Sequence, residues 1–126
     1  MTMKIKKLPD AEFEVMKTIW ENTPPVTTNL LMEQLGNEKG WKAPALITLL
    51  VRLTDRGFLR SEKIGKLRYY YPLIEKGEYL KFETETFMKR FHGNSLSSFV
   101  ASMSDEKNLD DKDLQELLDW AKERKK

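Results

Sequence analysis

The spacing of the apolar residues changes at Gly57. The leucines before it recur at i, i+3, i+4 and i+7, which places them on one face of an α-helix: Leu46, Leu49, Leu50 and Leu53. After Gly57, two short runs with strand character, 59–63 and 67–71, flank the sequence IGK, whose glycine suits a tight turn. The sequence therefore predicts a helix that is followed directly by a small antiparallel β-hairpin.

Two more helices are predicted before that helix. One spans about 10–21, with an apolar stripe at helical spacing: Phe13, Met16, Ile19 and Trp20. The other begins at an N-cap, Thr27, and continues through about Leu35, and we expect Gly36 to end it. Three helices followed by a hairpin form a winged helix-turn-helix, whose third helix enters the major groove of DNA. We assign residues 1–74 to this domain.

Residues 75–126 have a different pattern. Three amphipathic helices are predicted, over about 75–92, 94–106 and 109–126. So short a segment cannot bury all their apolar surface alone, and a second copy of the same segment is the simplest partner. We therefore predict a C-terminal three-helix dimerisation domain, with a core internal to that domain as the alternative. The predicted dimer contacts are Tyr79, Phe82, Phe87, Phe91, Leu114, Leu117 and Leu118. The expected fold class is mainly α with a small antiparallel β-hairpin.

Basic residues are concentrated in one stretch. Residues 39–74 contain eight Lys or Arg and two Asp or Glu, a local net charge of +6, whereas the whole chain has +2. Such a surface can face the phosphates of nucleic acid, and a simple solvated face is the alternative. A winged-helix module that binds protein instead of DNA is the competing functional interpretation, but such a module need not be basic.

Other functional classes find little support. The chain has no cysteine, a single histidine (His92), and six glycines scattered singly, so thiolate, metal-cluster and phosphate-loop motifs are missing from the sequence. We expect no enzymatic activity, no cofactor and no metal. No apolar run reaches the roughly 18–20 residues that span a bilayer, and no signal-peptide pattern follows the basic N-terminus. We expect a cytoplasmic protein without membrane insertion.

Two further features locate DNA contacts in the sequence. Lys42 stands at the start of the third helix, where free N–H groups also favour a phosphate. Three basic residues lie at or near the tip of the hairpin and should hold the DNA backbone: Lys63, Lys66 and Arg68. Because three consecutive tyrosines, 69–71, alternate between the faces of a strand, at least one should be core.

Several segments resemble the penicillinase-repressor (BlaI/MecI-type) family. The segments are LPDAEFEVMKTIW, GWKAPALITLLVRLTDRGFLR and KIGKLRYYYPLI, and the helical tail is similar to that family's dimerisation domain. The resemblance covers nearly the whole chain. It implies a bacterial transcriptional repressor that binds double-stranded palindromic operator DNA as a homodimer and controls β-lactam-resistance or related genes.

The resemblance also implies residue roles. Thr48 and Arg52 match the family's T-L-L-x-R-L motif, which implies that Thr48 contacts phosphate or a base edge and Arg52 contacts phosphate or guanine. The alternative for Arg52 is an ion pair with Asp55 or Glu62.

Just before Thr48, the family often has polar residues where this chain has Pro44 and Ala45. Weak hydrogen-bonded base readout is expected there, and apolar side chains could contact thymine methyl groups instead: Ala45, Ile47 and Val51.

The family's induction route is proteolysis in the C-terminal domain, triggered by a membrane sensor. The matching cut would lie near Ser102 and Met103. The known repressors of the family are cut between Asn and Phe, and this chain has neither residue there, so the resemblance leaves β-lactam control open.

Overall fold

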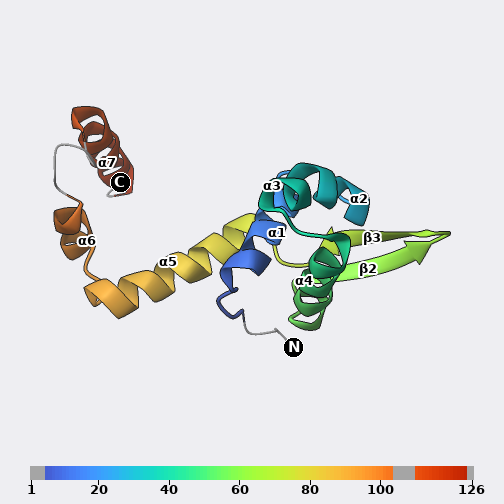
Figure 1. The fold of residues 1–126 in the computed structure, drawn as a ribbon. Helices are drawn as coiled ribbons and strands as arrows, with labels where there is room; N and C mark the ends of the chain where they lie inside the picture. The colour runs from blue at the N-terminus through green and yellow to red at the C-terminus, as the bar shows by residue number, and fades with distance from the viewer. Residues whose placement is uncertain (1–4, 104–109, 125–126) are drawn as a thin grey trace. The chain divides into compact units, whose positions relative to one another are not determined.

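The computed structural model describes residues 5–103 and 110–124. The chain forms two compact units, Met1–Glu83 and Thr84–Lys126. The fold is mainly helical, as expected, with one small antiparallel sheet in the first unit (Figure 1). No helix in the described part of the chain is long and apolar enough to cross a membrane.

Helices make up most of the first unit. In chain order they are α1 (Asp10–Trp20), α2 (Thr28–Leu31), the π-helical turn η1 (Met32–Gly36), α3 (Asn37–Lys39) and α4 (Ala43–Asp55). Thr27 caps α2 as predicted, because its Oγ1 accepts a hydrogen bond from the backbone N of Leu30 at 3.2 Å.

Gly36 does not end the second helix, contrary to the sequence-based expectation. The helical backbone continues from α2 through η1 and α3, and Gly40, at φ 74°, is the residue that stops it. Gly36 is instead a packing residue: a Cβ there would lie 2.6 Å from the sulfur of Met32. A glycine in a helical sequence can therefore indicate close packing as well as a helix end.

The sheet has three strands in the order β1-β3-β2. They are β1 (Val26–Thr27), β2 (Leu59–Ile64) and β3 (Leu67–Pro72), and all pairs are antiparallel. The predicted hairpin is present, and Gly65 begins its two-residue turn at φ 64°. β1 was not predicted, because two residues are too few to show an alternating pattern.

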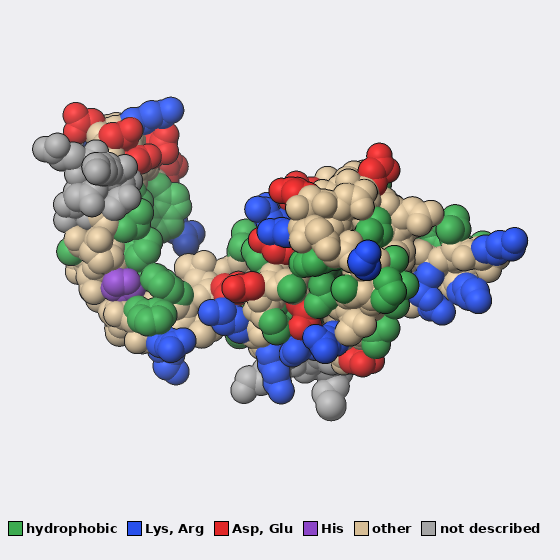
Figure 2. Space-filling model, viewed as in Figure 1, with side chains coloured by type: hydrophobic (Ala, Val, Ile, Leu, Met, Phe, Trp, Pro, Cys, Tyr) green, Lys and Arg blue, Asp and Glu red, His purple; other side chains and the backbone are tan. Residues whose placement is uncertain are grey.

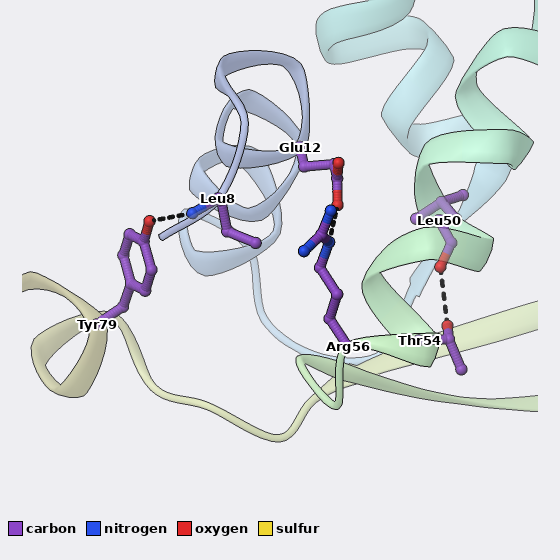
Figure 3. Close-up of polar contacts among 6 residues, drawn as sticks. All are labelled: Leu8, Glu12, Leu50, Thr54, Arg56 and Tyr79. Atoms are coloured by element: carbon purple, nitrogen blue, oxygen red, sulfur yellow. Dashed lines mark hydrogen bonds and ion pairs between the residues drawn. The ribbon is translucent and has the colours of Figure 1, made fainter. Parts of the chain in front are cut away.

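The core of the first unit includes the start of the next helix, α5 (Lys76–His92). Tyr79 of α5 is fully buried and packs edge-on against Phe58, with ring centroids 5.5 Å apart. Its hydroxyl accepts a hydrogen bond from the backbone N of Leu8 at 2.8 Å (Figure 3). Phe82 is partly buried against the same core.

Tyr79 and Phe82 therefore correct the predicted dimer surface. Both were expected to contact a second copy, but they complete the core of their own chain. The first compact unit accordingly extends past the expected boundary at residue 74 and ends at Glu83. The helical pattern of α5 is continuous across this boundary, so periodicity alone could not locate it.

The second unit contains the rest of α5, then α6 (Leu96–Ser102) and α7 (Asp111–Arg124). All three predicted tail helices are present, with their outermost predicted residues partly outside the described ranges. Gly93 and Asn94 end α5 with positive φ, and Ser95 caps α6 by accepting from the backbone N of Ser98 at 3.1 Å. Within its described residues the second unit has no buried side chain.

Candidate nucleic-acid interface

Helix α4 is anchored to the core by its inward face. Leu46, Leu50 and Leu53 are fully buried, as their spacing predicted. The helix packs against α1 and against β2, so it lies beside the hairpin (Figure 1). Lys42 is the N-cap residue, and Gly57, with φ 84°, allows the chain to turn directly into β2. The fold thus leaves the opposite face of α4 open.

An ion pair fixes the C-terminal end of α4 to α1. The Nε of Arg56 donates to Oε1 of Glu12 at 2.7 Å, and the Glu12 side chain is only 2% exposed (Figure 3). Arg56 contributed to the +6 of residues 39–74, but its guanidinium is held by this carboxylate. The sequence could have indicated that Glu12 is buried, because Glu12 lies four residues before Met16 on the buried stripe of α1.

The four residues predicted at α4 as DNA contacts are all exposed: Lys42, Ala45, Thr48 and Arg52. The hydroxyl of Thr48 donates to the backbone oxygen of Pro44 at 3.0 Å, so its hydrogen is used within the helix. Within the described residues, Arg52 forms no ion pair with Asp55 or Glu62. Its guanidinium is therefore available to a partner.

The β2–β3 hairpin, residues 59–72, is the wing. Lys63, Lys66 and Arg68 are all exposed, and Lys and Arg side chains gather at the free end of this hairpin (Figure 2). Lys63 lies opposite Arg68 in the register of the two strands, and Lys66 lies in the turn. The Nη1 of Arg68 donates to the Ser61 hydroxyl at 2.9 Å, which limits the freedom of the guanidinium.

The tyrosines of β3 are divided between two faces of the wing. Tyr70 is buried in the core, as at least one of the three had to be. On the other face, the guanidinium of Arg60 lies 3.9 Å from the ring centroid of Tyr71, a cation–π contact. Of the wing cations, Lys63, Lys66 and Arg68 therefore remain as the candidates for DNA.

A groove lies along the junction between α4 and the wing. Its walls are mainly apolar, and it is lined by four residues of α4 and three of the wing: Ile47, Val51, Thr54, Asp55, Ser61, Arg68 and Tyr70. At about 100° per residue, the apolar residues considered for thymine contacts do not all lie on the same flank of α4. Ile47 and Val51 line the groove, whereas Ala45 does not.

The remaining predicted dimer contacts are exposed in the second unit. Phe87, Phe91, Leu114, Leu117 and Leu118 are each at least 40% exposed. Phe87 packs edge-on against Phe99 of α6, with centroids 6.2 Å apart, so part of this surface is an aromatic contact between two helices.

Ser102 and Met103, the predicted cut site, lie at the C-terminal end of α6. Ser102 is exposed and its hydroxyl donates to the backbone oxygen of Phe99 at 2.7 Å; Met103 is half-buried.

Comparison with known proteins identifies this arrangement. The model of the family described as "Penicillinase repressor" matches residues 8–123, which is nearly the whole chain. The chain belongs to the penicillinase repressor family. Members of this family are DNA-binding transcription regulators and not enzymes, in agreement with the sequence-based expectation.

Individual relatives of the penicillinase repressor family match over nearly their full lengths. The chain is 32% identical to the penicillinase repressor of Bacillus licheniformis over 97% of this chain and 94% of that protein. It is 28% identical to the methicillin resistance regulatory protein MecI of Staphylococcus aureus, over 93% and 94% of the two chains.

A solved structure supports the winged-helix assignment. The solution structure of the DNA-binding domain of the repressor BlaI matches with a TM-score of 0.54 and 35% identity, and it covers 62% of this chain and 94% of that one. The fold of the N-terminal part of this penicillinase repressor family member therefore corresponds to a DNA-binding domain.

Proposed function

We propose that this chain represses transcription as a homodimer that binds a palindromic operator, with one winged-helix unit on each half-site. The observation that carries the proposal is the set of exposed cations on α4 and the wing: Lys42, Arg52, Lys63, Lys66 and Arg68. In this arrangement α4 enters the major groove, and the wing contacts the adjacent backbone.

The roles of the cations follow from their positions. Lys42, at the start of α4, binds a phosphate together with the free N–H groups of the first helical turn. Arg52 contacts phosphate or guanine, since its guanidinium is not paired with Asp55 or Glu62 among the described residues. Lys63, Lys66 and Arg68 hold phosphates and fix the register of the protein on the duplex.

The apolar surface of the second unit supports the dimer. Phe91 and Leu118 are 59% and 55% exposed, and such side chains are seldom left in water over several neighbouring helices. A second copy supplies the complementary surface by symmetry, and the two linked DNA-binding units then gain affinity over either one alone.

We also propose that proteolysis in the second unit regulates the repressor. The cut lies near Ser102 and Met103, within the apolar second unit, so cleavage would weaken the dimer and release the operator. The names of the relatives, penicillinase repressor and methicillin resistance regulatory protein, support β-lactam-resistance or related genes as targets. A membrane sensor-protease would deliver the signal.

A salt-dependent gel-shift titration tests the proposal. The probe is the DNA upstream of the protein's own gene, and binding is measured at several salt concentrations with purified protein. We expect specific binding that weakens steeply with salt, because each phosphate contact releases counterions. Absence of binding, or binding without salt dependence, would contradict the proposal and favour a winged-helix module that binds protein.

A further inference from the structure

We infer that Ile47 and Val51 contact the C5-methyl groups of thymine, so that apolar contact determines much of the half-site specificity of α4. The inference rests on the proposed operator binding and adds the chemistry by which the bases are recognised. Its basis is the groove between α4 and the wing.

The side chains of Ile47 and Val51 are unusually exposed to solvent for their residue types. They lie one helical turn apart, at i and i+4, and are 44% and 52% exposed. Isoleucine and valine are among the residues most often buried in folded proteins. Both side chains line the groove, so together they form an apolar surface beside the wing.

Few side chains of α4 can donate hydrogen bonds to the edges of DNA bases. The hydroxyl of Thr48 donates to the oxygen of Pro44, and that of Thr54 donates to the oxygen of Leu50 at 2.8 Å (Figure 3). Both hydroxyl hydrogens are therefore used by the helix itself. Direct donors to base edges are then left mainly to Arg52, which lies on the other flank of α4 from Ile47.

The groove carries one acidic and one basic side chain, so its own charge does not select a phosphate as its occupant. Asp55 places a carboxylate on the α4 side of the groove, which repels phosphate. Arg68 lines the opposite side and is held by Ser61. Among the base-edge groups exposed in the major groove, the thymine C5-methyl is the apolar one. The surrounding cations, which include Lys42 and Lys63, are then left to contact the phosphates of the DNA backbone.

Replacement of thymine by deoxyuridine tests the inference, because uracil lacks only that methyl group. A DNA duplex that contains two half-sites is first selected from a randomised library with the full-length protein. Each thymine of this duplex is then replaced in turn by uracil. We expect one or two positions per half-site at which the affinity falls about fourfold, the effect of losing one buried methyl-sized group.

Two variants assign the effect to the side chains. Val51→Ala and Ile47→Ala should each reduce the thymine-to-uracil affinity ratio toward one at a single position. Leu73→Ala is the matched control, because Leu73 is 53% exposed but does not line the groove, and its ratio should equal that of the unchanged protein. Effects of uracil on the DNA itself are common to all variants and cancel in this comparison.

The outcomes separate this inference from the proposed function. Salt-dependent binding with equal affinity for thymine and uracil at every position would overturn the methyl contacts alone. A ratio that persists in both Val51→Ala and Ile47→Ala would do the same. Failure of the unchanged protein to select or bind any duplex would overturn the operator-binding proposal as well.

Discussion

At the scale of single residues, Arg52 and Arg56 have opposite roles although they stand one turn apart. Arg52 is exposed, whereas Arg56 is paired with the buried Glu12. A charge count cannot distinguish them, because it contains no information on where the partner carboxylate lies. Only the packing of α1 against α4 brings residues 44 positions apart in sequence within hydrogen-bonding distance.

The two arginines should therefore respond differently to the same substitution. Arg56→Ala leaves the Glu12 carboxylate buried without a partner and should lower the free energy of unfolding by about 2–4 kcal/mol. Arg52→Ala should change it by less than about 0.5 kcal/mol but weaken operator binding about tenfold or more. Urea unfolding and gel-shift titration of both variants check this. A stability loss in Arg52→Ala, or none in Arg56→Ala, would contradict the assignment.

Tyr79 gives a prediction about pH. Burial raises the pKa of the Tyr79 hydroxyl to about 12, while the hydrogen bond from Leu8 acts in the opposite direction. Because this pKa lies above the ordinary tyrosine value, the unfolded chain loses the proton first. The contribution of Tyr79 to the free energy of unfolding is therefore complete below about pH 10 and is lost as the pH rises toward about 12.

The size of this contribution is about 2–3 kcal/mol, from the difference between the two pKa values. The free energy of unfolding should fall more steeply above about pH 10 in the unchanged protein than in Tyr79→Phe. Tyr71→Phe is the control, because Tyr71 is only half-buried and should keep the steep fall. Equal slopes for all three proteins would show that Tyr79 does not titrate as described.

At the scale of elements, the segments with a clear local pattern were predicted, whereas β1 was not. The leucine spacing of α4 and the glycine turn of the wing each give a clear local signal. β1 has two residues and is a strand only because β3 pairs with it, Val26 opposite Tyr70. Its existence depends on residues more than 40 positions away, which no local pattern contains.

The wing is also the element with the clearest electrostatic prediction. Lys63→Ala/Lys66→Ala removes two of the proposed phosphate contacts in each protomer of the proposed dimer. It should lower operator affinity and flatten the slope of log affinity against log salt by about 1.8 per protomer. The matched control is Lys76→Ala/Lys81→Ala, which removes two exposed lysines of α5. If both double variants change the slope equally, the effect is one of net charge and the wing has no special role.

At the scale of the whole molecule, the division between units decides which fragments can fold. The sequence pattern placed the boundary at residue 74, but the buried Tyr79 and the packed Phe82 belong to the first unit. The amphipathic pattern of α5 indicated that its apolar side would be covered, without indicating by which surface. Only the three-dimensional contacts divide that side between a core within the chain and a proposed partner.

Truncation at two positions tests this division. A fragment of residues 1–83 should be folded and monomeric, with much weaker operator binding than the full chain, because one half-site replaces two. A fragment of residues 1–75 lacks Tyr79 and should be less stable by roughly 3–5 kcal/mol, by analogy with the loss of a buried aromatic side chain. Circular dichroism and sedimentation measure both properties. A dimeric 1–83 fragment would place the dimer contacts in the first unit.

The π-helical turn η1 has a consequence for changes in chain length. A π-turn contains one residue more than the α-helical turn it replaces, so the segment Met32–Gly36 holds a residue that the helix does not need for continuity. Glu33 is exposed, and its deletion would leave Leu31 and Leu35 three positions apart, still on one helical face. A single-residue deletion should therefore be absorbed here as a regular α-turn, whereas the same deletion within α4 would rotate every later side chain by about 100°.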